Sequence, residues 1–360
     1  MPKTTKSKKT KSSKSERATE RPVVATMGCP RGVGPEVCVG AAFALGAPAC
    51  VVVGSRAVLQ QAAFALGISA RKWRTVRDFD LAEGRFSGLR VLSIGPELDH
   101  NATSWGRPDA AAGVAQLKWV EEGYRLARQC GWPLVTGPVS KEAIARSGLK
   151  RARSFRGHTE WLQKLDGAAH SVMCFSSSKL TCSLVTTHVP IRALPRALTA
   201  AGVTQAILEL ADLLLRRGQA RPRLAVCSLN PHGGEGELLG KEESSVIVPG
   251  VDRAAELLGR RARLEGPLGA ETAFRRAAAG GYAGVVAMYH DQATIPMKLL
   301  DFGGAVNVTQ GLSIVRTSVD HGTAYDIAGK GLVDSRGMSE AMHLAARLAT
   351  KKRRIEHGNW

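Results

Sequence analysis

Residues 22–46 read PVVATMGCPRGVGPEVCVGAAFALG. A short apolar run (22–26) leads into a glycine-rich segment (27–35), and a helical pattern follows. Pro35 stands where the start of a helix tolerates proline. The stretch therefore predicts a strand, a tight turn and a helix.

The glycines of this turn stand at positions 28, 32 and 34. Their spacing does not match GxGxxG, so a Rossmann dinucleotide site is not predicted. A turn of this kind can present backbone N–H groups to a phosphate or a nucleotide. A tight turn that needs positive φ explains the glycines equally well.

Apolar runs and helical patterns keep alternating as far as residue 349. Further strands are expected at 50–53, 89–94, 134–136, 172–175, 180–187, 224–228, 285–289, 306–309 and 314–319. Helices are expected after Ser55 as N-cap, from Asp109 to Gly131, and over 205–216, 242–258 and 338–349. This alternation predicts an α/β protein with largely parallel sheets.

Length and composition exclude several classes of protein. A chain of 360 residues favours two domains, and a hydrophobic content of 44% excludes a wholly disordered protein. No apolar run has the length of a membrane helix, and the lysine-rich start is not a secretory signal. Seven cysteines without a CxxC pair argue against a disulfide framework and favour the cytoplasm.

The net charge of +19 is unevenly distributed. Residues 1–21 hold six Lys, two Arg and two Glu, and we expect them to form a disordered basic tail that mainly aids solubility. The rest of the chain is basic as well, which favours anionic ligands. Aromatic residues make up only 5%, and no nucleic-acid-binding signature is found, so nucleic acid is an unlikely partner.

Three histidines each follow an apolar run. His188, His232 and His290 stand where a predicted strand gives way to a polar or Gly/Pro-containing turn. Ligands of open α/β sheets collect at the carboxyl ends of strands, and neutral imidazole is a common metal ligand. Their separations of 44 and 58 residues follow no local rule, so a structural or surface role stays open at this point.

Several other residues are suited to an anion. His158 and Thr159 enter a predicted helix, where Thr159 could act as a cap or the helix N-terminus could bind phosphate or carboxylate. Lys298, Asn307 and Arg316 lie on or beside the strands after His290 and suit an anionic substrate. Such residues are more often solvated, so a surface role is the alternative.

Residues 321–331, HGTAYDIAGKG, resemble the HG[ST]AxDIAGKG element of the isocitrate and isopropylmalate dehydrogenase superfamily. In that superfamily this loop holds the adenosine half of NAD, and its Asp contacts the ribose hydroxyls. The resemblance implies an α/β fold of two domains with an intervening active-site cleft, which is not Rossmann. It also implies a cofactor site made by His321, Gly322, Thr323, Ala324 and Asp326.

Further motifs occur in a fixed order and narrow the resemblance. They are TGPVSKEAI (136–144), GHTEWL (157–162), TTHVP (186–190), LNPHGGEG (229–236), GPLGAETAF (266–274), AMYHDQ (287–292) and VNVTQGL…VRTSVDHGTA (306–324). Together they resemble the 4-hydroxythreonine-4-phosphate dehydrogenase family over residues 23–349. The first turn departs from the family's G-[DE]-P-A-G-[IV]-G-P pattern at Cys29 and Arg31.

The family resemblance implies a set of site residues. His188, His232 and His290 match ligands of a divalent metal (Zn, Mg or Co) that two subunits of a homodimer share. His158, Thr159, Lys298, Asn307 and Arg316 match substrate contacts. Asp291 and Lys298 are candidates for the general base because they lie near His290 in the sequence.

The implied reaction is the NAD-linked oxidation of 4-phosphooxy-L-threonine toward 3-amino-2-oxopropyl phosphate, with loss of CO₂, in pyridoxal 5′-phosphate synthesis. NADP is the alternative cofactor. Two other functions stay open: oxidation of a related phosphorylated acid such as threonate or erythronate 4-phosphate, and a non-catalytic binder built on the same fold.

The expected domain division follows from the same resemblance. The first domain is expected to comprise 22–137 and 285–350, and the second 138–284. Residues 351–360 form a basic C-terminal end.

Overall fold

The computed structural model describes residues 21–69, 73–76, 86–96, 98 and 105–355. The basic tail 1–20 and residues 356–360 lie outside the described residues. The strands are β1 (Val23–Thr26), β2 (Cys50–Gly54), β3 (Arg74–Val76), β4 (Leu89–Ser93), β5 (Leu134–Thr136), β6 (Val172–Ser176), β7 (Thr181–Leu184), β8 (Arg223–Cys227), β9 (Arg263–Leu268), β10 (Gly284–Ala287), β11 (Val306–Gln310) and β12 (Arg316–Val319). The helices are α1 (Gly34–Phe43), α2 (Arg56–Ala65), α3 (Ala110–Cys130), α4 (Lys141–Ala145), α5 (His158–Asp166), α6 (Leu194–Ala197), α7 (Ala200–Arg216), α8 (Val248–Leu258), α9 (Ala270–Ala278), α10 (His290–Leu300) and α11 (Arg336–Ala349).

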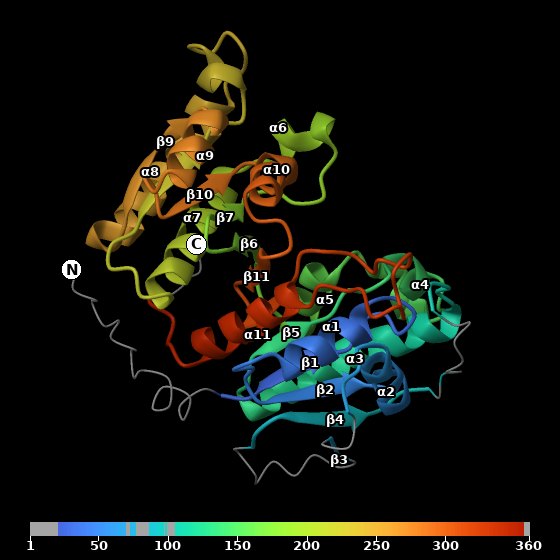
Figure 1. Cartoon of the computed structure of the whole chain (residues 1–360). Coiled ribbons are helices and arrows are strands. Elements are labelled where there is room, and N and C mark those ends of the chain that lie inside the picture. Colours follow the sequence, from blue (N-terminus) through green and yellow to red (C-terminus); the bar gives the residue numbers. More distant parts are fainter. Residues whose placement is uncertain (1–20, 70–72, 77–85, 97, 99–104, 356–360) are drawn as a thin grey trace, which may run out of the picture.

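One sheet of twelve strands runs through the described part of the chain, in the order β3-β4-β2-β1-β5-β12-β11-β6-β7-β10-β8-β9 (Figure 1). The strands from β3 to β12 pair in parallel, and so do those from β7 to β9. Between these two groups β11 and β6 pair antiparallel with each other and with β12 and β7. The predicted α/β class with largely parallel pairing is therefore confirmed.

The predicted domain division stays a prediction. It places residues from 285 onward in the first domain, whereas β10 (Gly284–Ala287) pairs with β7 and β8, which it places in the second domain. Helix α4, which was assigned to the second domain, packs on α3.

The first strand, turn and helix form as predicted. All four residues of β1 are buried, and Pro35 occupies the first turn of α1. Gly28 has φ 76°, and a Cβ atom there would come within 2.5 Å of the Pro138 carbonyl oxygen. Glycine is required at this position because no other residue fits the close approach of the two backbones.

Several predicted helix ends are confirmed. The Ser55 hydroxyl accepts from the Val58 N–H at 3.5 Å, and the Asp109 carboxylate accepts from the Ala112 N–H at 2.6 Å. Gly131 ends α3 in the left-handed conformation. The expected cap at Thr159 was wrong, because Gly157 holds the N-cap position of α5.

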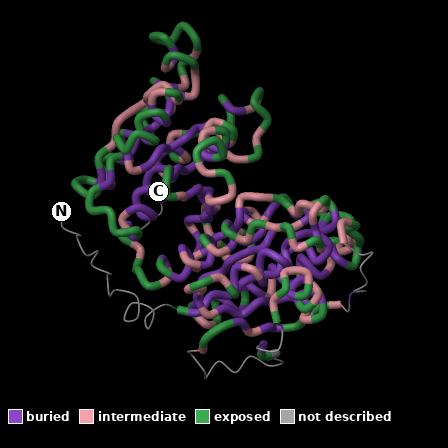
Figure 2. The backbone as a smooth tube through the Cα atoms, viewed as in Figure 1, coloured by how far each residue is buried: buried purple, intermediate pink, exposed green. Residues whose placement is uncertain are grey.

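The core lies between the sheet and the helices on both of its faces (Figures 1 and 2). α1 and α11 pack against each other, α11 also contacts β12, and α3 lies on β1. Around β7, β8 and β10 a second apolar cluster includes Phe175, Phe274 and Met297. β9, at the edge of the sheet, is only partly buried.

The C-terminal end docks on α7. Arg353 forms an ion pair with the buried Glu209 at 2.6 Å, and the backbone N–H of Arg354 donates to Asp212 at 2.6 Å. Ile355 is 2% exposed. The predicted basic end is thus partly integrated in the core, because α7 buries two carboxylates that require cationic partners.

None of the described helices is by itself long and apolar enough to cross a membrane. Residues 191–197 and α7 meet the length and composition together, but they are bent by 92°.

Glu36 joins α1 to the segment 321–331. Its side chain is fully buried, and its two carboxylate oxygens accept from the backbone N–H groups of Gly329 at 2.8 Å and Gly331 at 2.9 Å. Hydrogen bonds to a buried carboxylate are stronger than those between neutral groups. This one side chain therefore fixes the loop on the first helix.

Glu36→Ala should lower the free energy of unfolding by about 3 kcal/mol, because it leaves two partly buried N–H groups without their carboxylate acceptor. Urea titration measures the change. The matched control is Glu142→Ala, which removes a carboxylate from an exposed pair with Arg146 and should cost less than about 0.5 kcal/mol. Equal losses in the two variants would contradict this role of Glu36.

Candidate active site

A buried arginine without a carboxylate partner lies in the middle of the sheet. Arg316, on β12, is 2% exposed. Its guanidinium donates to the hydroxyls of Thr309 at 2.8 Å and Thr136 at 2.6 Å, and to the Asn307 side-chain oxygen at 3.4 Å. No carboxylate of the described residues forms an ion pair with it, and its Nε has no hydrogen-bond partner. The surrounding groups bind the guanidinium but do not neutralise its charge.

Burial lowers the pKa of Arg316 to about 9, and the nearby charge of Glu160 opposes the shift. Arg316 is still a cation at neutral pH. A buried cation whose hydrogen-bond partners are all uncharged is energetically costly, and a bound anion would offset that cost.

His158 lies next to this arginine at the first position of α5. Its Nε2 is buried and has no hydrogen-bond partner. Burial first, and then the charges of Arg316 and Lys141, hold the pKa of His158 well below its usual range. The imidazole is therefore neutral and has a free nitrogen to offer to a ligand.

The structure brings four of the five predicted substrate contacts together. The Thr159 hydroxyl lies 3.5 Å from that of Thr309, which also binds Arg316. His158, Asn307 and Arg316 belong to the same cluster. Lys298, the fifth, lies on α10 and lines a different cavity.

Sequence reasoning missed three members of this cluster: Thr136, Thr309 and Lys141. Thr136 begins the TGPVSKEAI motif and Thr309 lies within the VNVTQGL motif, but a threonine in a strand carries no further signal of its own. Lys141 begins α4 within the TGPVSKEAI motif, and that motif was the available signal.

His188 and His290 face each other. Their ring centroids are 5.7 Å apart. Nδ1 of His188 lies 3.3 Å from a Glu160 oxygen, and Nδ1 of His290 lies 2.7 Å from an Asp291 oxygen. A carboxylate on one nitrogen orients the ring and directs the other nitrogen toward a metal. The pair thus has the form of two metal ligands with their supporting carboxylates.

His232 does not join this pair within one chain. It lies on the turn Pro231–Gly234 after β8, with φ 53° and a side chain that is 76% exposed. The segment between β8 and α8 lies at the tip of an arm that also carries α8 and β9 (Figure 1). Within the described residues, no group of three His, Cys, Asp or Glu side chains is arranged to hold a metal.

The loop 321–331 borders a cavity of about 300 Å³. Of the predicted cofactor residues, His321 and Ala324 line it, together with Lys298 and Phe302. Gly322, Thr323 and Asp326 are not among the lining residues, and Asp326 is exposed.

The first turn supports this loop. The Val33 N–H donates to the Thr323 carbonyl at 2.9 Å, and the Cys29 sulfur lies 3.5 Å from the Tyr325 hydroxyl. Arg31 is nearly buried and pairs with Asp109 at 2.9 Å. The two residues that depart from the family pattern therefore have local partners.

Asp320 lines this cavity and was not selected in the sequence analysis, although it lies within the VRTSVDHGTA motif. Burial raises the pKa of Asp320, while the charges of Lys298, His290 and His321 act in the opposite direction. All three basic groups are therefore close to one carboxylate. Of the two predicted catalytic residues, Lys298 lines the cavity and Asp291 contacts His290; their catalytic roles stay predictions.

Residues 47–345 match the family model described as "Pyridoxal phosphate biosynthetic protein PdxA". The chain belongs to this family. The resemblance that the motifs indicated is thereby confirmed.

Relatives carry two different substrate names. The chain is 39% identical over 344 residues to the 4-hydroxythreonine-4-phosphate dehydrogenase of Caulobacter vibrioides, covering 93% of this chain and 99% of that one. It is also 39% identical over 332 residues to the D-threonate 4-phosphate dehydrogenase of Cupriavidus necator, covering 91% and 97%. The crystal structure of the Klebsiella pneumoniae 4-hydroxythreonine-4-phosphate dehydrogenase matches with a TM-score of 0.78 at 34% identity, covering 92% and 99%.

Arg316→Met should remove one bound phosphate ion per chain, because the methionine keeps the volume and loses the only buried charge of the cluster. Isothermal calorimetry with inorganic phosphate measures the stoichiometry. The affinity at this site should fall at least about tenfold, because a hydrogen bond to a charged group contributes about 1.5 kcal/mol or more. Arg146→Met, on the exposed surface of α4, is the control and should bind as the unchanged protein does. A folded Arg316→Met variant with unchanged stoichiometry would show that the cluster does not bind phosphate.

Proposed function

We propose that this protein catalyses the metal-dependent, NAD-linked oxidation and decarboxylation of 4-phosphooxy-L-threonine toward 3-amino-2-oxopropyl phosphate, a step of pyridoxal 5′-phosphate synthesis. The observation that carries the proposal is the buried Arg316 cation, which lacks a carboxylate partner and lies beside the free nitrogen of His158. The names of the relatives support the choice of a phosphorylated hydroxy acid.

The cluster around Arg316, with His158, Thr159 and Asn307, would bind the phosphate group. Arg316 presents a planar set of donors held in place by Thr136 and Thr309, and such a set matches phosphate geometry. The N-terminus of α5 adds backbone N–H groups at His158 and Thr159. Fixing one end of the substrate in this way orients its hydroxyl and carboxylate.

His188 and His290 would hold a divalent metal. Their rings, each with a carboxylate on Nδ1, fit an ion that accepts imidazole, and zinc or cobalt suits nitrogen ligands better than magnesium does. When bound, the ion supplies a Lewis acid that lowers the pKa of the substrate hydroxyl. Glu160 contacts His188 and lies two residues after His158, so the metal pair and the phosphate cluster would bind two ends of one molecule.

A second copy of the chain would provide His232. Large apolar side chains are exposed in the chain segments that follow the three histidines: Ile191 at 77%, Leu238 at 82% and Leu299 at 82%. Apolar surface of this kind commonly marks an interface. A homodimer with shared active sites would cover these side chains and complete the ligand set.

The chain's own groups would then take up the proton. Lys298, which lines the cavity near His290 and His321, would accept the hydroxyl proton, and Asp291 is the other candidate. NAD, when bound, would supply the acceptor for the hydride from the carbon that bears the hydroxyl. The resulting β-keto acid can lose CO₂. The adenosine half of NAD would lie on the loop 321–331, with Asp326 on the ribose.

D-Threonate 4-phosphate is the second candidate substrate, because the Cupriavidus necator relative is as similar as the first. Arg316 and His158 would bind the phosphate of either acid. The rate of NAD reduction is measured with each of the two acids, with and without a chelator. The acid with the higher kcat/KM is the substrate. A non-catalytic binder would reduce NAD with neither, although the His188–His290 pair argues against that function.

Mixed dimers test the shared metal site. His188→Ala and His232→Ala should each be inactive and metal-depleted. After the two variants are mixed through an unfolding and refolding cycle, half the dimers are hybrids. Each hybrid has one site with all three histidines, so about a quarter of the activity of the unchanged protein should return, on the statistics of random pairing.

The control mixture is His188→Ala with His290→Ala, whose lost side chains face each other in one chain. Each of its hybrid sites lacks one ligand, so no activity should return. Recovery in both mixtures, or in neither, would contradict a site that takes His232 from the partner.

The protein should prefer NAD to NADP by at least about tenfold in kcat/KM, because the 2′-phosphate would face the like charge of Asp326. Arg31 is poorly placed to offset this repulsion, since it already pairs with Asp109. Asp326→Lys should move the preference toward NADP. Equal use of both cofactors by the unchanged protein would place the ribose elsewhere.

A further inference from the structure

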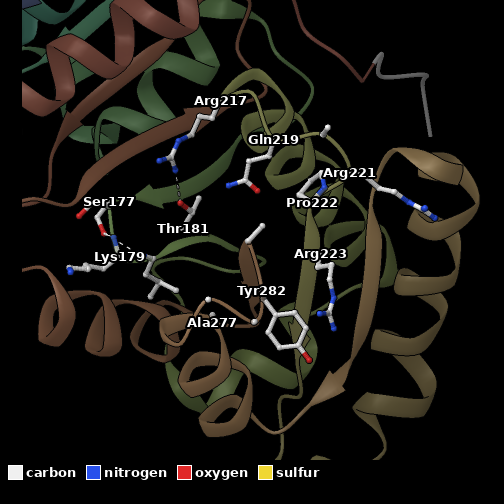
Figure 3. A pocket seen from close by; sticks show the side chains of 16 residues that line it. Ser177, Lys179, Thr181, Arg217, Gln219, Arg221, Pro222, Arg223, Ala277 and Tyr282 are labelled. Atoms are coloured by element: carbon white, nitrogen blue, oxygen red, sulfur yellow. Dashed lines mark hydrogen bonds between the residues drawn. The ribbon is translucent and has the colours of Figure 1, made fainter. Parts of the chain in front are cut away.

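A cavity of about 560 Å³ lies away from the candidate active site. Three segments form it: 177–181, 217–223 and 277–283. They precede or begin β7, β8 and β10. The carboxyl ends of these same strands lead to His188, His232 and His290, so the cavity lies at the opposite ends of the strands (Figure 3).

The cavity is strongly cationic. Four basic side chains line it: Lys179, Arg217, Arg221 and Arg223. No Asp or Glu is among the lining residues. Arg223 pairs with Glu265 at 3.3 Å and lies over the Tyr282 ring. In Figure 3 the side chains of Arg221 and Arg223 point away from the middle of the hollow. These two contribute positive potential at its rim rather than direct contacts.

Arg217 is held by two hydroxyls at the wall of the cavity. Its Nη1 donates to the hydroxyls of Ser176 at 2.8 Å and Thr181 at 2.7 Å. No carboxylate of the described residues forms an ion pair with it, and partial burial of the group, followed by the charge of Arg347, lowers its pKa. Unlike the buried Arg316, Arg217 is an exposed residue, so its charge is accessible to a ligand from solution.

The remaining lining favours a small and polar ligand. Figure 3 places Gln219 beside Arg217, with Ser177 and Lys179 on the adjoining wall. Most other lining residues are Gly, Ala or Pro, and Tyr282 is the one aromatic side chain among them. Apolar surface for a large ring system is therefore scarce, while hydrogen-bond donors converge on one side.

We propose that this cavity is a second anion site, which binds a small phosphate-bearing molecule through Arg217 and Lys179. The geometry of Arg217 provides a planar set of donors, and Lys179 provides a mobile charge. A phosphate group, with two negative charges and several acceptor oxygens, matches both. This site is independent of the proposed reaction and of the cluster around Arg316.

Calorimetry with inorganic phosphate, at constant ionic strength, tests the proposal. The unchanged protein should bind two phosphate ions per chain. Arg217→Met should remove one and leave NAD reduction unchanged, whereas Arg316→Met should remove the other. Lys179→Met changes an exposed side chain and should preserve the fold; it should weaken the same site about tenfold, as loss of one charged contact does.

The possible outcomes separate the two sites. If Arg217→Met keeps two phosphate ions and Lys179→Met leaves both affinities unchanged, the second site is wrong and the proposed function is untouched. If only Arg316→Met keeps two, the proposed active-site cluster is wrong instead. Glycerol 3-phosphate in place of inorganic phosphate distinguishes a site for phosphate esters, which should bind the ester more tightly, from one for the free ion.

Discussion

The register of β12 against its two neighbours is the constraint on which the rest of the structure depends. Arg316 lies opposite Thr309 of β11 and next to Leu134 of β5. This alignment puts the hydroxyls of Thr309 and Thr136 on the guanidinium. A shift of one residue would turn Arg316 to the other face of the sheet. Because β11 also joins the two groups of parallel strands, the same pairing holds the molecule together and builds the cluster around Arg316.

The site distributes its charges in a definite way. Cations without carboxylate partners, chiefly Arg316, gather where a phosphate is proposed to bind. Carboxylates gather around the histidines, where Glu160 and Asp291 orient the rings. Glu160 belongs to both neighbourhoods, since its charge also acts on Arg316. The cations would attract the phosphate group, and the carboxylates would attract the divalent metal. Each ligand would therefore bind at its own part of the site.

The sequence predicted those parts of the fold that have a strong local signal. Buried strands such as β1 and β2 are continuous apolar runs, and caps such as Asp109 have side chains suited to their task. β3 and β9 were missed because they are short or partly exposed edge strands, with no apolar run of their own. The short helix α4 was missed as well, since five residues give too little periodicity. The start of α5 was predicted at His158 and Thr159, although its end was not.

The candidate site was predictable only through motifs. No spacing rule connects Thr136 with Arg316, which lie 180 residues apart in the chain; strand order brings them together. His232 shows a further limit. A ligand that acts from a second copy leaves no pattern within one chain other than an exposed position followed in the chain by exposed apolar residues such as Leu238. Asp320 was not selected, although it lies within the VRTSVDHGTA motif, because its surroundings come from α10 and from the loop after β12.

The position of α10 relative to the loop 321–331 decides whether hydride transfer can occur. The loop is fixed to α1 by the carboxylate of Glu36, and to the turn before α1 by the hydrogen bond from Val33 to Thr323. This turn follows β1, one of the parallel strands from β3 to β12. α10, with His290 and Lys298, follows β10 in the other group. Reacting atoms must lie about 3–3.5 Å apart, and a misplacement of about 1 Å can cost a hundredfold in rate. Asp320, which follows β12, is a carboxylate on which the charges of Lys298, His290 and His321 all act. The antiparallel strands at the centre of the sheet join the strands that carry the loop to the strands that carry α10, so they fix the relative position of the two.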